Sequence, residues 1–250
     1  MSAFEWRPLA DEIARWRECG LELRLWLRDD DASQPTPALE RLIAVSRRHE
    51  RPLLLAVIPA RAGPALAARL AQEHLILPCQ HGFAHVNHAP AGEKKSELGA
   101  HRPLDMVLAE LAAGRDRMRT LFGARTAPIL VPPWNRIAPA LVDALPQLGF
   151  AALSCFGPAV SRPPPLQIIN CDLDIINWHG GRVSFPPAEL TRQLVAQLAD
   201  ARGRGGASVG VLLHHLIHDE NAWIWLDGLC AQLHDTAIAW SPSLAPTTKT

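Results

Sequence analysis

Three consecutive aspartates and a spaced pair of histidines are the residues of this sequence best suited to chemistry. Asp29, Asp30 and Asp31 stand together, and carboxylates this close raise one another's pKa unless a cation neutralises them. His81 and His85 have the i, i+4 spacing that can place two imidazoles on one side of a helical turn. Taken singly, each motif also fits a solvated acidic turn or an ordinary surface or core histidine pair. Together, two histidines and a carboxylate describe a catalytic metal site with open positions.

A second group of histidines follows the apolar stretch 209–213. His214 there could be a general acid, a metal ligand or a core histidine hydrogen-bonded to the backbone. His215 and His218 add the alternative of a metal hydrolase built on this cluster, because His214 and His218 repeat the i, i+4 spacing. Cys79 is a poor candidate nucleophile, since its apolar neighbours include no base that would lower the pKa of its thiol.

Hydrophobic period and the proline and glycine positions predict a regular alternation of strands and helices. Such alternation implies parallel pairing and therefore an α/β fold. About seven strand–helix units favour a closed (β/α)7-8 barrel over an open doubly wound sheet. We expect a single domain over 1–250, with a loose tail at 241–250. Strands are predicted at 21–27, 53–58, 75–77, 129–131, 150–155, 166–176, 209–213 and 237–240. Helices are predicted at 8–19, 37–50, 64–73, 104–122, 137–148, 187–202 and 220–233, with a long polar loop at 80–102.

The unusual polar residues cluster where predicted strands end. The segments concerned are 29–31, 81–85, 132–136, 174–179 and 214–215. In parallel sheets and barrels, the carboxyl ends of the strands share one face, where sites are built from several loops. Five separate segments are therefore expected to form one site. Trp134 and Trp178 could line a sugar or acyl pocket there, or could simply fill the mouth of the barrel.

Composition excludes several classes of protein. The 25 basic and 25 acidic residues cancel, which argues against a non-specific nucleic-acid binder. No apolar run is long enough to cross a bilayer, and the first residues do not resemble a signal peptide. Five scattered cysteines without a C-x-x-C motif are typical of a reducing compartment. We therefore expect a cytoplasmic protein with neither a nucleic-acid nor a membrane partner.

In their order along the chain, these segments resemble the five motifs of the polysaccharide deacetylases, carbohydrate esterase family four. The resemblance extends from about residue 21 to residue 215. In the first motif, residues 28–32 (RDDDA), it matches Asp30 to the catalytic base and Asp31 to a metal ligand, and a register one residue earlier stays open. In the second motif, residues 81–85 (HGFAH), it matches both histidines to metal ligands, with glycine in place of a hydroxyl residue.

The remaining three motifs match with one clear departure. The third falls on residues 131–134 (VPPW), so that Val131 replaces the arginine that orients the base in the family. Arg136 and Arg28 are the candidates to substitute for it. The fourth motif falls on residues 174–178 (DIINW) and the fifth on residues 212–214 (LLH). These departures place the chain in a divergent branch.

The resemblance implies a distorted barrel and a metal-dependent deacetylase that hydrolyses an N-acetyl, N-acyl or O-acetyl group. The substrate would be a small N-acyl sugar or an oligosaccharide. Asp31, His81 and His85 would hold a divalent metal, and Asp30 would take the proton of the attacking water. Two histidines and a carboxylate suit zinc first, with iron, cobalt or nickel as alternatives.

The same resemblance assigns the groups around the scissile bond. His214, oriented by Asp174 or another nearby acid, would protonate the leaving amine. The residues expected to contact substrate are Pro133, Trp134, Arg136 and Trp178. Two other functions stay open: an inactive carbohydrate-binding relative with the same fold, and a metal hydrolase of another amide substrate.

Overall fold

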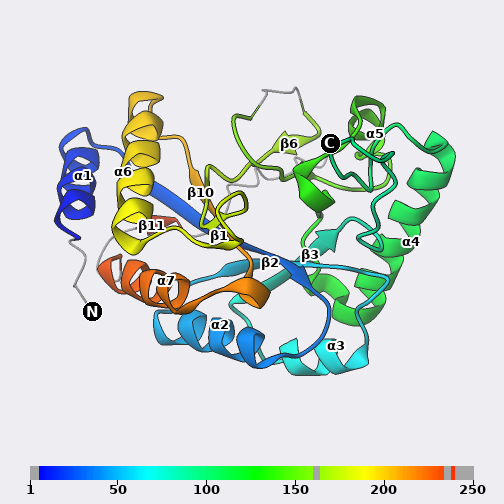
Figure 1. Cartoon of the computed structure of the whole chain (residues 1–250), viewed down its shortest axis with the longest axis horizontal. Coiled ribbons are helices and arrows are strands. Elements are labelled where there is room, and N and C mark those ends of the chain that lie inside the picture. Colours follow the sequence, from blue (N-terminus) through cyan, green and yellow to red (C-terminus); the bar gives the residue numbers. More distant parts are fainter. Residues whose placement is uncertain (1–5, 160–163, 234–237, 240–250) are drawn as a thin grey trace. The chain divides into compact units, whose positions relative to one another are not determined.

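A computed structural model describes residues 6–159, 164–233 and 238–239, so the tail expected at 241–250 lies outside the described residues. Contacts divide the chain into two compact units, whereas the single domain expected from the sequence stays a prediction. Among the described residues, the first unit contains 6–29, 36–53, 171–233 and 238–239. The second contains 30–35, 54–159 and 164–170. The strand β1 (Leu23–Ala32), labelled in Figure 1, contributes residues 23–29 to the first unit and residues 30–32 to the second.

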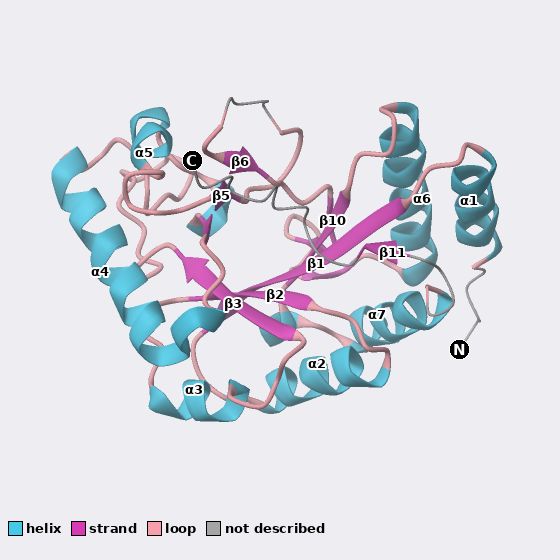
Figure 2. Cartoon of the chain, turned by 180° about the vertical axis from the view of Figure 1, so that it is seen from behind, coloured by secondary structure: helices cyan, strands magenta, loops and turns pink. Residues whose placement is uncertain are grey.

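The first unit is a parallel sheet with helices. Its strands pair in the order β1, β10 and β7, and β11 pairs with the other edge of β1. Helices α1 and α6 lie side by side (Figure 2), where Trp16 Nε1 donates to the Leu198 carbonyl at 3.2 Å. Its elements are α1 (Arg7–Glu18), α2 (Pro37–Arg48), β7 (Leu173–Asp174), β8 (Ile176–Asn177), β9 (Val183–Ser184), α6 (Pro187–Gly203), β10 (Val209–Leu213), α7 (Glu220–Gln232) and β11 (Ile238–Ala239).

The second unit continues the same architecture. Its strands follow the order β2, β3, β4, β5 and β6, all parallel where their registers are defined. The end of β1 joins this unit, because the Ile58 amide donates to the Ala32 carbonyl at 2.9 Å. Its apolar core includes Leu111, Leu130 and Phe150. Its elements are β2 (Leu53–Val57), α3 (Pro64–Leu70), β3 (Ile76–His81), α4 (Leu104–Phe122), β4 (Ile129–Val131), α5 (Pro139–Ala144), β5 (Ala152–Leu153) and β6 (Gln167–Ile168).

Parallel strands joined through helices confirm the α/β class and the distorted (β/α)7-8 barrel type predicted from the sequence. Helix starts follow local signals. The Thr36 side chain accepts from the Leu39 amide at 3.0 Å at the start of α2, and a proline follows at the first helical position. None of the helices in the described part of the chain is long and apolar enough to span a membrane.

The carboxyl ends of two strands that carry site residues were predicted wrongly. β1 does not end at residue 27 but continues through the three aspartates to Ala32, and β3 continues to His81 rather than ending at residue 77. Polar and charged residues suggest a turn because burying them is costly. Here Arg28, Asp29 and Asp30 are nevertheless buried within β1. Region 166–176 likewise differs from its prediction, since it contains β6, β7 and the start of β8.

Candidate metal centre and proton-transfer groups

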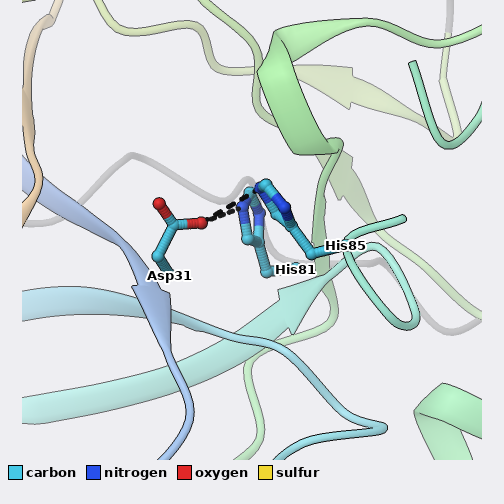
Figure 3. A group of neighbouring side chains, drawn as sticks. All are labelled: Asp31, His81 and His85. Carbon is cyan, nitrogen blue, oxygen red and sulfur yellow. Dashed lines mark hydrogen bonds and ion pairs between the residues drawn. The ribbon is translucent and has the colours of Figure 1, made fainter. Parts of the chain in front are cut away.

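Asp31, His81 and His85 point toward one another in the second unit (Figure 3). Asp31 Oδ1 lies 3.2 Å from His81 Nε2 and 3.1 Å from His85 Nε2. One ligand atom from each residue lies within 4.8 Å of the others, and no other such group of three occurs in the part of the chain that the structure describes. The edge of a zinc tetrahedron with bonds of about 2.0–2.1 Å is roughly 3.3 Å. The two distances from Asp31 to the histidines are close to this edge, as expected for ligands that share a small divalent cation.

The His81 ring is fixed by a contact on its far side. Its Nδ1 lies 3.0 Å from the Val131 carbonyl, and only a protonated Nδ1 can donate to that oxygen. A neutral ring then carries its lone pair on Nε2, which faces Asp31. Metal-binding histidines characteristically donate their second nitrogen to a carbonyl or carboxylate in this way. The arrangement thus leaves Nε2 available as a ligand.

Asp31 carries the negative charge that a cation site requires. Burial tends to raise the pKa of this carboxyl, but the hydrogen bonds and positive charge of His81 and His85 outweigh burial and hold the pKa below its ordinary value. Because His81 already donates through Nδ1, its contact with Asp31 needs either a second ring proton or a cation between the two groups. The donor set therefore fits a divalent metal.

Backbone conformation directs two of these side chains. Asp31 has φ +73° and His85 has φ +57°, both in the left-handed region that few non-glycine residues adopt. A regular strand would place Asp29 and Asp31 on the same face, and the left-handed residue breaks that alternation. The His85 ring also packs against Trp134, with ring centroids 4.3 Å apart. Trp134 has φ +55° as well.

The structure distinguishes the three aspartates from one another. Both oxygens of the Asp29 carboxylate accept from His215, at 2.5 Å from Nδ1 and 2.8 Å from the backbone amide. Asp29 and His215 are both fully buried. Asp31 contacts the two histidines of the metal group, and Asp30 is buried between these two neighbours. This geometry favours the register with Asp31 as the metal ligand over the register one residue earlier.

His214 lies in the first unit together with the predicted residues Asp174 and Trp178. Asp174 accepts from the Trp178 indole at 2.7 Å and from the Ile176 amide at 2.9 Å. The Trp178 ring meets the His214 ring edge-on, with centroids 4.8 Å apart. Asp174 thus holds the indole that packs against His214. Within the described residues, the buried Nδ1 of His214 has no hydrogen-bond partner.

The alternative metal site at the second histidine group is not supported. His215 Nδ1 is committed to Asp29, and His218 Nε2 accepts from the His214 amide at 3.3 Å. Burial lowers the pKa of His218 to about 4, so its ring is neutral near pH 7. His215 Nδ1 and His218 Nε2 therefore form hydrogen bonds within the cluster and do not point toward a shared metal position.

The two arginine candidates have different surroundings. Arg136 Nη1 donates to the Lys95 carbonyl at 2.8 Å, an exposed contact with the long loop, which directs its guanidinium to that loop. Arg28 is fully buried in β1, two residues before Asp30. Side chains two apart on a strand share a face. Arg28 is thus the nearer of the two to Asp30 along the chain, and the choice between them stays a prediction.

Sequence reasoning missed Glu97, which is buried and accepts from backbone amides of the loop that carries His85. The polar region 80–102 contains two glutamates, Glu93 and Glu97, and nothing in the sequence distinguishes Glu97 from its neighbour. Pro133, which was predicted to contact substrate, lies next to Gly82 of this loop. A Cβ added to Gly82 would be 2.6 Å from the Pro133 ring.

No family model and no curated protein sequence matches the chain. Solved structures do match. A peptidoglycan deacetylase from Bacillus subtilis shares 14% identity and a TM-score of 0.56, covering 88% of this chain and 87% of that one. A family 4 acetyl xylan esterase from Clostridium thermocellum, in complex with a cobalt ion, shares 12% identity and a TM-score of 0.56, covering 87% and 86%. The chain has the fold of the family 4 carbohydrate esterases.

That fold includes proteins of more than one kind. A third match is a family 4 pseudoenzyme from Bacillus anthracis, with 12% identity, a TM-score of 0.58 and coverage of 87% of this chain and 63% of that one. At such identities the comparisons establish the family 4 fold alone, and function has to be argued from the site.

Proposed function

We propose that this chain is a metal-dependent deacetylase that removes an N-acetyl or other N-acyl group, or an O-acetyl group, from a carbohydrate. The observation that carries this proposal is the group of Asp31, His81 and His85, whose ligand atoms converge in the fold of the family 4 carbohydrate esterases. A small or intermediate acylated sugar is the substrate class. We also propose a cytoplasmic location, supported by five free cysteines.

The residues of the metal group would hold one divalent cation. When bound, such a cation polarises an acyl carbonyl and lowers the pKa of a coordinated water to about 7. Two imidazoles and a carboxylate suit zinc, and they also suit iron, cobalt or nickel. The cobalt in the acetyl xylan esterase supports a divalent transition metal without selecting one.

Asp30 is the proposed general base. Its carboxylate is almost fully buried and adjoins the metal ligand Asp31 in the chain, which suits it to take a proton from the attacking water. Arg28, buried on the same strand, is the arginine proposed to orient this carboxylate in place of the one that Val131 replaces.

His214 is the proposed general acid that protonates the leaving amine. Its ring is packed by Trp178, and Asp174 holds that indole in place. Asp174 therefore positions the acid through Trp178. Trp134 and Pro133 lie beside the loop that runs from His81 to His85, and we propose that they contact the acyl group.

An inactive carbohydrate-binding relative is the second candidate. Val131 stands where the resemblance expects an arginine, and one structural neighbour is a pseudoenzyme. Metal binding with no acetate release from any acetylated sugar would favour this candidate.

The deciding experiment compares wild type with Asp30→Asn, both purified without a histidine tag and supplied with one equivalent of Zn²⁺ or Co²⁺. Acetate release is measured on N-acetylated chitooligosaccharides, N-acetylglucosamine and acetylated xylooligosaccharides. We expect turnover by wild type and a loss of about 10²- to 10⁴-fold in kcat for the variant, with metal content unchanged. Absence of turnover in metal-loaded wild type on every substrate, or full activity of the variant, would contradict the proposal.

A further inference from the structure

One buried carboxylate organises the loop that leads from His81 to His85. Glu97 is only 1% exposed. Its Oε1 accepts from the amides of Ala84 at 2.7 Å and Val86 at 3.4 Å, and its Oε2 accepts from the amide of Phe83 at 3.0 Å. Every one of these donors belongs to the backbone of the metal-binding loop or the residue just after it.

This arrangement offsets the cost of burying the charge. An unpaired buried carboxylate is strongly unfavourable, whereas several backbone donors around one anion form a stable cradle. The same bonds restrict the loop. Gly82 and His85 both have positive φ, +53° and +57°, and hydrogen bonds to the residues between them hold the chain in this uncommon path.

Gly82 and Glu97 depend on each other for space. A Cβ on Gly82 would lie 2.0 Å from Glu97 Oε2 and 2.6 Å from the Pro133 ring, far inside van der Waals contact. The hydroxyl residue that the resemblance expects at position 82 therefore does not fit beside this carboxylate. Glycine at 82 and glutamate at 97 form a matched pair.

The segment between the loop and Glu97 is itself fixed at both ends. Asn87 Oδ1 accepts from the amides of Ala89 at 3.1 Å and Ser96 at 2.9 Å, and these hydrogen bonds join the start of the segment to its end. Directly after Glu97, the fully buried Leu98 accepts from the Ala138 amide at 2.7 Å. The carboxylate is thus presented from an anchored backbone.

We propose that Glu97 is a positioning residue that sets the conformation of the metal-binding loop and so directs the His85 imidazole toward Asp31. Glu97 acts through the backbone of residues 83–86 and not as a ligand. Its effect on metal affinity rests on the proposed metal site, but its effect on the loop does not.

The test uses Glu97→Ala and Glu97→Gln, with Glu93→Ala as the matched control. Glu93 belongs to the same segment, but its side chain is 58% exposed and lies 3.7 Å from His101. Two readouts are taken on the full chain: backbone amide hydrogen exchange of residues 83, 84 and 86 in metal-free protein, and Zn²⁺ affinity by competition with a chelator.

We expect Glu97→Ala to lose protection at these amides and to bind Zn²⁺ about 10- to 100-fold more weakly, a typical result of removing an outer-sphere contact. Glu97→Gln should be intermediate, because its amide oxygen can still accept from one side while its NH2 group opposes a donor. Glu93→Ala should match wild type in both readouts. The three proteins are compared under conditions in which the same fraction of each is folded. A general loss of stability would then not make Zn²⁺ affinity rise in the order alanine, glutamine, glutamate at position 97.

Wild-type exchange and wild-type affinity in Glu97→Ala would overturn the inference. If that variant does not fold, wild-type behaviour of a folded Glu97→Gln overturns it equally. A failure of the proposed metal site would give a different result from a failure of this inference. Wild type would then bind no Zn²⁺, and the hydrogen-exchange comparison in metal-free protein would still test the role of Glu97.

Discussion

Two groups of aspartate and histidine in this molecule share composition and spacing but differ in the direction of their lone pairs. Asp31 accompanies His81 and His85, and Asp29 accompanies the segment from His214 to His218. In the first group, three ligand atoms converge on one point. In the second, His215 donates to Asp29 and His218 accepts from a backbone amide. The i, i+4 spacing alone therefore does not define a metal site.

Hydrogen bonds from neighbouring groups account for the difference. The Val131 carbonyl occupies Nδ1 of His81 and leaves Nε2 to face Asp31. In the second group, each oxygen of the Asp29 carboxylate accepts a hydrogen bond from His215, one from the ring and one from the backbone amide. The first group is arranged to bind a cation, whereas the second uses its carboxylate within the group and leaves only the buried Nδ1 atoms of His214 and His218 without a hydrogen-bond partner among the described residues.

The largest expected effect concerns that ring. His214→Ala should lower kcat by about 10²- to 10⁴-fold, because a positioned general acid contributes that much to the rate, and it should leave metal stoichiometry unchanged. Steady-state acetate release and metal analysis on the same preparation measure the two quantities. Loss of metal together with activity would mean that the two groups are not functionally separate.

Next in size is the buried pair of the second group. Asp29→Ala should reduce the free energy of unfolding by about 3–5 kcal/mol, since removing one partner leaves the other polar group buried without compensation. Asp31→Ala in metal-free protein should cost much less, because its carboxyl is about one-third exposed. Urea unfolding of both variants checks the contrast, and equal destabilisation would refute it.

The second group should also make folding stability depend on pH through His218. Burial lowers the pKa of His218 to about 4, below its ordinary value of 6.5. Between these pH values the unfolded chain binds more protons than the folded chain, so stability falls as pH decreases through this window. The contribution is about 3 kcal/mol at 1.36 kcal/mol per pKa unit. Unfolding of wild type and His218→Gln at pH 7, 5.5 and 4 should show the steeper decline in wild type. Parallel curves would argue against it.

The helix cap at Thr36 provides a control in which stability changes and metal binding does not. Thr36 caps α2 and is a member of neither group, so Thr36→Ala should cost about 1 kcal/mol without changing metal affinity. Thr36→Ser keeps the hydroxyl and should behave as wild type. Thermal unfolding and a Zn²⁺ titration measure both properties, and a change in affinity would show that stability and metal binding are coupled.

Local signals predict much of this fold. The limits of α4, β4 and β10 agree with their predictions, because period and flanking prolines or glycines act over a few residues. The ends of β1 and β3 were wrong, because the buried charges there depend on distant partners. Asp29 and His215 are 186 positions apart, and no local pattern connects them.

The site shows the same limit. Asp31, His81 and His85 could be predicted because their residue types identify the chemistry. The role of Glu97 could not, because its partners are backbone amides, which leave no mark in the sequence. The commitment of Asp29 to His215, rather than to a metal, likewise became visible only in three dimensions.

The most direct test of the central claim is the metal content of untagged protein, measured beside His81→Ala and the control His101→Ala after equilibration with Zn²⁺ and gel filtration. His101 lies near Glu93 in the long loop, outside the metal group. We expect one ion per chain in wild type and in the control, and none in His81→Ala. No ion in wild type, or the same content in all three proteins, would contradict it.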